Sequence, residues 1–224
     1  MENSIRIDKI IEDLSQKINH IDLQRFETTV FTQDQLKIKD FLDERRIHYL
    51  IHFTDAKNIP SIKQNGILSV KQLGDREMSY DFNDKYRHDK EKDYISLSIS
   101  GMNQYLYKTF RYNNRTIEHG VAVIINAEML YKEIGTHRIY CNTNAATTEA
   151  QKGNTLNDFE AMFADVVSYA TKSNEEPRVI DRNEEHRSSY ETTDVQAEIL
   201  WNKCVPTEYI LCYWDLEEDF FYGN

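Results

Sequence analysis

Residues 50–54 read Leu50-Ile51-His52-Phe53-Thr54, and residues 194–200 read Asp194-Val195-Gln196-Ala197-Glu198-Ile199-Leu200. Short apolar runs of this kind predict strands inside a core. The first run carries a histidine and a threonine, and the second carries a glutamate. A polar group that leaves water needs a hydrogen-bonding partner. His52 and Glu198 are therefore either satisfied core groups or side chains that face one ligand.

After the first run, Thr54-Asp55 predicts a helix start directly behind the strand 48–53, and Asn65-Gly66 predicts the end of that helix. Residues 94–100 alternate apolar side chains with serines, which predicts a strand with one serine-bearing face. Further strands are predicted at Gly120–Asn126, Val166–Tyr169, Gln196–Leu200 and Tyr209–Trp214. Several strands mixed with helices predict an α+β fold.

The first 45 residues differ from the rest in pattern. Isoleucines and a leucine recur at helical spacing over residues 7–18, and Thr32-Gln33-Asp34-Gln35 resembles a capping box before a second apolar stripe. We therefore expect a helical N-terminal extension over residues 1–45 and a main domain over residues 46–224. Its apolar stripe predicts packing on the main domain.

The composition narrows the class of protein and the compartment that we expect. Three cysteines without metal-type spacing predict neither a disulfide framework nor a metal site. Without an apolar run of membrane-spanning length or a secretion signal, we expect a soluble protein of the cytoplasm and no membrane partner. The net charge of −11 argues against a broad basic nucleic-acid surface. Any nucleic-acid contact would be local.

One local candidate is the stretch 105–115, where tyrosines and a phenylalanine alternate with Lys108, Arg111 and Arg115. It predicts either a charged face over core aromatics or a groove in which bases stack beside cations. A second candidate is the long polar segment between Asn142 and Val195, which is interrupted by the apolar residues 159–169. We expect a loop that contacts substrate here, with Tyr190 as its aromatic.

Together these segments resemble the DarT nucleic-acid ADP-ribosyltransferases, toxins encoded beside an antitoxin. The resemblance spans residues 47–214 and rests on these segments in order: residues 51–54 with Asn58, residues 65–68, Ser79-Tyr80 with Arg87, Asp93-Tyr94, and Gln196-Ala197-Glu198. It implies an ADP-ribosyltransferase-type fold: two packed, mainly antiparallel sheets around an NAD cleft, with flanking helices. It also implies NAD as the ADP-ribose donor.

The resemblance assigns roles to individual residues. It makes Glu198 and Arg87 catalytic. It assigns NAD contacts to His52, Phe53, Thr54, Asn58, Gly66, Leu68 and Arg87, and substrate reading to the loop before Glu198. With the residue patterns above, we expect acceptor contacts at Tyr105, Arg111, Tyr190 and Gln196. Single-stranded DNA or RNA and a cognate antitoxin protein are the implied partners.

The chemistry agrees with these roles. Cleavage between nicotinamide and ribose leaves a cation-like sugar, which a carboxylate such as Glu198 stabilises as charge develops. Arg87 offers two parallel donors to a pyrophosphate in a chain that has no glycine-rich phosphate loop. Because a guanidinium rarely loses a proton, Glu198 or His88 is the candidate base.

Each residue also has a structural alternative. His52 could be a core histidine bonded to a backbone carbonyl, Glu198 could pair with Arg138 or Arg178, and Arg87 could be a surface charge. The strand 94–100 and residues 101–107 depart from the DNA-modifying members, which carry an aromatic strand and a proline-containing Met-Leu-Tyr segment. The serine-bearing strand is closer to other ADP-ribosyltransferases, in which a Ser-x-Ser segment lines the NAD site.

We therefore expect an NAD-dependent toxin that modifies a base of single-stranded DNA. RNA bases, a protein acceptor and a non-enzymatic binding module remain as alternatives.

Overall fold

The computed structural model describes residues 31–78, 92–133, 138–147, 149–170 and 176–223. The chain divides between Gln33 and Asp34, and the fold below is that of Asp34–Asn224. Its elements are α2 (Gln33–Arg45), β1 (Tyr49–Asp55), the 3-10 turn η1 (Ala56–Asn58), α3 (Ile59–Asn65), α4 (Val70–Asp75), β2 (Ile95–Ile99), α5 (Gln104–Lys108), the π-helical turn η2 (Thr109–Asn113), β3 (Gly120–Asn126), α6 (Met129–Lys132), β4 (Arg138–Cys141), β5 (Lys152–Gly153), α7 (Leu156–Ala161), β6 (Val166–Tyr169), β7 (Arg178–Asp181), β8 (Glu198–Trp201), the 3-10 turn η3 (Thr207–Tyr209), β9 (Ile210–Asp215) and β10 (Phe220–Gly223).

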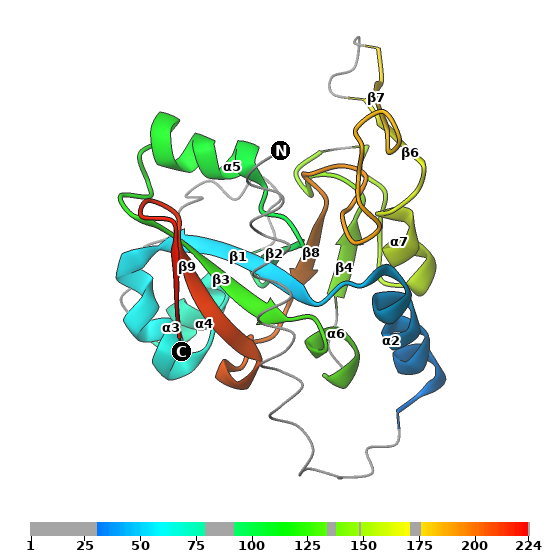
Figure 1. Cartoon of the computed structure of the whole chain (residues 1–224). Coiled ribbons are helices and arrows are strands. Elements are labelled where there is room, and N and C mark those ends of the chain that lie inside the picture. The colour runs from blue at the N-terminus through cyan, green and yellow to red at the C-terminus, as the bar shows by residue number, and fades with distance from the viewer. Residues whose placement is uncertain (1–30, 79–91, 134–137, 148, 171–175, 224) are drawn as a thin grey trace. The chain divides into compact units, whose positions relative to one another are not determined.

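The main sheet has the strand order β10-β9-β3-β1-β2-β8-β4-β5. Its pairings between the described strands are antiparallel, so the expected α+β class with mainly antiparallel strands is confirmed. The pairing of β1 with β2 covers only Leu50↔Ile99 and Ile51↔Ser98. The two expected sheets correspond to the two halves on either side of this short join, and their strands run in different directions (Figure 1).

Each predicted strand boundary lies within two residues of the observed one, and β3 and β6 have the predicted bounds. β3 is buried along almost its whole length because it lies between β1 and β9, which explains its continuous apolar sequence. β2 follows the predicted alternation, but its serine face is covered: Ser98 and Ser100 are both 7% exposed. The sequence patterns missed β4, β5, β7 and β10, which have two to four residues, too few for a clear period.

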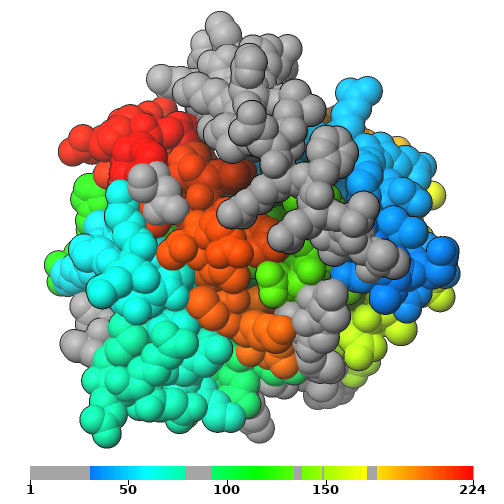
Figure 2. All heavy atoms as spheres, turned by 90° about the horizontal axis from the view of Figure 1, so that it is seen from below, coloured from blue at the N-terminus to red at the C-terminus, as the bar shows by residue number. Residues whose placement is uncertain are grey.

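The chain turns sharply after β1, as predicted from Thr54-Asp55. The Asp55 carboxylate accepts a hydrogen bond from the Lys57 amide at 2.9 Å and caps η1. α3 ends at Gly66, whose φ of +73° is the left-handed conformation that favours glycine. Residue Ile67 then pairs with Val205. In Figure 2 the atoms of α3 and α4 lie directly beside those of the orange segment that leads into β9.

The second stripe of the expected N-terminal extension forms α2, which belongs to the described unit. Its Phe41 packs against Phe159 of α7 and against Phe163, with ring centroids 5.0 and 5.4 Å apart. The apolar stripe of residues 7–18 lies outside the described residues. None of the described helices has the length and apolar character that a membrane span needs.

The segment 142–195 is more ordered than a long loop. It contains β5, α7 and the separate hairpin β6–β7. Thr155 caps α7 through a reciprocal pair of bonds with Asp158, a local signal of helix start. The irregular part that leads into Glu198 is limited to residues 182–197.

Candidate functional site

Glu198 is the first residue of β8, between β2 and β4, and is only 7% exposed. The Ser96 hydroxyl donates to Oε2, and the Ala145 amide donates to Oε1 at 2.6 Å. Both carboxylate oxygens therefore have a donor, as burial of a polar group requires. The Ser96 hydroxyl and the Ala145 amide therefore set their orientation before any ligand binds.

His52 lies in β1, on the other side of β2. Its Nδ1 is 3.0 Å from the Ser96 carbonyl oxygen. A carbonyl only accepts, so Nδ1 carries the hydrogen of this bond. This is the carbonyl bond of a core histidine, yet the ring is only half-buried. Ser96 thus holds both predicted residues, His52 through its backbone and Glu198 through its side chain.

The turn before Glu198 is built by Asp194, which is 1% exposed. One of its carboxylate oxygens accepts from the Gln196 amide at 2.9 Å, and the other accepts from the Thr143 hydroxyl at 2.6 Å. The Ala197 amide donates to the Asp194 carbonyl at 3.0 Å. Aspartates commonly form such turns with the amide two residues on, so this local signal could have identified Asp194.

The loop 183–193 before this turn is held by Arg182, which is 9% exposed. Its guanidinium donates to the carbonyl oxygens of Ser188 and Glu191, the latter at 2.7 Å. Burial lowers the pKa of this guanidinium from its ordinary value. From α2, Arg45 donates to the Ser189 carbonyl at 3.3 Å. The predicted acceptor residue Tyr190 lies half-buried in this loop.

The other predicted NAD residues of β1 have identifiable contacts. Thr54 is buried, and its hydroxyl accepts from the Asn58 amide group at 2.9 Å. The ring of Phe53 lies against those of Tyr107 and Phe110. Phe53 therefore contributes to packing between β1 and the helical segment α5–η2.

Gly66 and Leu68 lie after α3. A side chain at Gly66 would collide with the Val205 carbonyl oxygen, and Leu68 is 8% exposed. Both positions therefore have structural reasons for their residues, independent of a ligand. The predicted catalytic Arg87 and the candidate base His88 lie outside the described residues, as do Ser79 and Tyr80.

Two arginines, Arg138 and Arg178, were considered in the sequence as ion-pair partners of Glu198. Arg138 donates to the Leu130 carbonyl, and Arg178 lies at an exposed position of β7. Among the described residues, no group of three or more His, Cys, Asp and Glu side chains is arranged to hold a metal ion.

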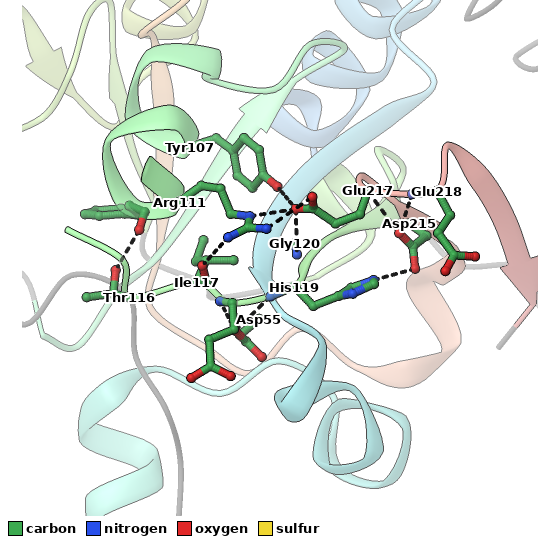
Figure 3. A network of polar contacts seen from close by, with 12 residues as sticks. Asp55, Tyr107, Arg111, Thr116, Ile117, His119, Gly120, Asp215, Glu217 and Glu218 are labelled. Atoms are coloured by element: carbon green, nitrogen blue, oxygen red, sulfur yellow. Dashed lines mark hydrogen bonds and ion pairs between the residues drawn. The ribbon is translucent and has the colours of Figure 1, made fainter. Parts of the chain in front are cut away.

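The predicted acceptor residues Tyr105 and Arg111 differ in exposure. Tyr105 is 61% exposed, whereas Arg111 is paired with Glu217 at 2.8 Å (Figure 3). This pairing holds the pKa of the Glu217 carboxyl below its ordinary value. Arg111 thus forms an ion pair with a carboxylate of the protein itself.

A family model described as "DarT: ssDNA thymidine ADP-ribosyltransferase, DarT" matches residues 51–213, well over half of the chain. No curated protein matches the chain. Among solved structures, Thermosipho africanus DarTG in complex with ADP-ribose aligns with a TM-score of 0.46 and 16% identity, over 75% of this chain and 44% of that chain. Thermus sp. 2.9 DarT in complex with NAD+ aligns with a TM-score of 0.45 and 15% identity, over 75% of this chain and 81% of that chain.

The chain therefore spans less than half of the DarTG chain. The family match contains both strands that carry the predicted donor-site residues, β1 from Ile51 onward and the whole of β8. The chain belongs to the DarT family of ssDNA thymidine ADP-ribosyltransferases, and its matched region is an NAD-dependent ADP-ribosyltransferase domain.

Proposed function

We propose that this chain transfers ADP-ribose from NAD to a thymidine base of single-stranded DNA and releases nicotinamide. The observation that supports the proposal is the Glu198 carboxylate, held by Ser96 and Ala145 and linked through Ser96 to His52. The carboxylate and the imidazole suit the hydroxyl-rich ribose of the donor. NAD supplies the ADP-ribose group when the bond between nicotinamide and ribose breaks and its electron pair leaves with nicotinamide.

The described residues have separate roles in this proposal. His52 Nε2 accepts a hydrogen bond from a ribose hydroxyl, which orients the sugar. Glu198 lies where its negative charge stabilises the positive charge that develops on the ribose. A group preset in this way needs little rearrangement during the reaction, which is the main source of such stabilisation.

The acceptor base forms a bond to the ribose carbon through a ring nitrogen and loses the proton of that nitrogen. Glu198 or His88 takes this proton, and Arg87 binds the donor phosphates with its guanidinium. The acceptor strand lies along the loop 183–193, whose backbone Arg182 holds. Tyr190 and Gln196 contact the strand from this segment.

We further propose that the chain acts as the toxin of a toxin–antitoxin or phage-defence pair, with a cognate antitoxin protein as its partner. Modification of bases in single-stranded DNA would block templates during replication. Expression without the antitoxin should therefore stop growth. Glu198→Gln should relieve this toxicity, because the amide keeps the shape of the side chain and removes its charge.

The test is incubation of labelled NAD with single-stranded DNA, with RNA and with total protein. Wild type should label the DNA, and Glu198→Gln should reduce the labelling about 100-fold or more. Glu160→Gln, an exposed change on α7, is the matched control and should label normally. Label on RNA or protein alone would contradict the proposed acceptor, and full labelling by Glu198→Gln would contradict the role of Glu198.

A further inference from the structure

The helical segment α5–η2 (residues 104–113) has an inner and an outer set of aromatic side chains. Tyr107 and Phe110 are each 6% exposed. Their ring centroids lie 5.7 and 6.1 Å from that of Phe53, the residue between His52 and Thr54. The segment is therefore packed on β1 through Phe53, on the face opposite to the side chains of His52 and Thr54.

The outer aromatics are Tyr105 and Tyr112, each 61% exposed. The Arg111 guanidinium lies 5.6 Å from the ring centroid of Tyr112, a cation–π distance. Exposed tyrosines beside cations are the side chains on which unstacked bases of single strands are held. From the sequence we expected an acceptor contact at Tyr105, but Tyr112 was not distinguished from the buried Tyr107 and Phe110.

The segment is anchored by the polar network of Figure 3. The Arg111 Nε donates to Glu217 at 2.8 Å, and the Tyr107 hydroxyl donates to the same carboxylate at 3.0 Å. Glu217 follows β9, so the network ties η2 to the sheet. π-Helical turns such as η2 are rare in proteins, and those that occur are often found at functional sites. The segment that carries Tyr105 and Tyr112 is therefore held in place by the protein before any strand binds.

The charge of the segment points to its partner. Residues 104–115 contain Lys108, Arg111 and Arg115 and no acidic residue, in a chain of net charge −11. Glu217 neutralises Arg111, so the net positive charge comes from Lys108 and Arg115. Lys108 and Arg115 are exposed. A local positive charge beside exposed rings complements the phosphates and bases of a single strand. A duplex lacks unstacked bases and cannot use the rings in this way.

We propose that Tyr105 and Tyr112 form a stacking surface for bases of the acceptor strand, with Lys108 and Arg115 near its phosphates. This inference rests on the proposed function and adds to it a binding surface outside the reacting base. Bound there, the strand would lie next to the segment that packs on Phe53. The surface would raise the affinity for longer single strands without taking part in bond breaking.

The test compares Tyr105→Ala and Tyr112→Ala with the wild type, each with a single-stranded oligonucleotide as acceptor. Each substitution should raise the KM for the oligonucleotide about 5- to 100-fold, while the KM for NAD stays near that of the wild type. The phenylalanine variants at the same positions keep the ring and should restore the wild-type KM. Phe220→Ala, a 44% exposed aromatic of β10, is the matched control.

Direct binding gives the second measurement. A labelled single strand should be displaced by the same unlabelled strand and much less by the duplex, and Lys108→Gln should reduce the salt dependence of binding. An unchanged oligonucleotide KM in both alanine variants would overturn the stacking surface and leave the proposed function standing. A wild type that modifies no nucleic acid would overturn the proposed function and this surface together.

Discussion

Ser96 offers the sharpest perturbation of the proposed active site because its two contacts separate cleanly. Its hydroxyl donates to Glu198, and its backbone carbonyl holds the His52 ring. Ser96→Ala removes the hydroxyl and keeps the carbonyl. The substitution should therefore release one oxygen of the Glu198 carboxylate and leave the tautomer of His52 as it is.

The size of the effect follows from the bond that is lost. A hydrogen bond to a charged group contributes about 1.5–3 kcal/mol, and each 1.36 kcal/mol of barrier is tenfold in rate. If the bond is used fully in orienting Glu198, kcat for ADP-ribose transfer should fall about 10- to 150-fold. The Ala145 amide still donates to the other oxygen at 2.6 Å, so the loss should stay below that of Glu198→Gln.

The assay is transfer of labelled ADP-ribose to a single-stranded oligonucleotide, with kcat and both KM values measured. Ser100→Ala is the matched control: Ser100 is 7% exposed near the end of the same strand, and its hydroxyl has no partner among the described residues. This control should lose little activity. In the Glu198→Gln background, Ser96→Ala should cause no further loss, because the two residues act as one unit.

The role of the Ser96 hydroxyl is refuted if Ser96→Ala stays within twofold of the wild-type kcat, or if Ser100→Ala loses as much. It is also refuted if the losses of Ser96→Ala and Glu198→Gln multiply in the double variant. Thermal unfolding of each variant separates these outcomes from a general loss of folded protein.

Two stability predictions follow from other parts of the structure. Gly66→Ala should lower the free energy of unfolding by about 1–3 kcal/mol in a denaturant titration, because residue 66 has φ +73° and a Cβ would collide with Val205. The control is Gly74→Ala in α4, where a Cβ meets open space. This control should be neutral or stabilising. Hydrogen bonding to Asp215 raises the pKa of His119 above its ordinary value. The protonated His119 therefore stabilises the folded state fully below about pH 6.5, and this stabilisation disappears as the pH rises through the raised pKa. Because the ring is half-exposed, this stabilisation is limited to about 1 kcal/mol. The difference in unfolding free energy between wild type and His119→Asn should be larger at pH 6 than at pH 9. An equal difference at both pH values would contradict the assignment.

Much of the candidate site was predictable because its signals are local. The apolar runs at β1 and β3 and the alternation at β2 each carry the period of a buried strand. Asp55 and Gly66 mark a helix start and a helix end through their own backbone chemistry. The glutamate inside an apolar run could be recognised as a group that needs partners.

The partners themselves were not predictable in this way. Ser96 and Glu198 are 102 residues apart, and they meet because β2 and β8 are neighbours in the strand order. Arg111 looked like a phosphate-binding residue, yet Glu217, 106 residues away, neutralises it. Strand order and register decide such contacts, and neither is encoded in the spacing of one segment.

Local patterns were enough to locate six of the strands, to place the start and end of the helix after β1, and to identify the family that the motifs resemble. In these segments, backbone conformation and burial depend first on neighbouring residues. The folded structure was needed to show that Ser96 links His52 to Glu198, that Arg182 holds the loop before Glu198, and which tyrosines of residues 104–113 are exposed. The physical reason is that a hydrogen bond or a buried ring depends on what the folded chain brings within a few ångströms, and distant segments provide those neighbours.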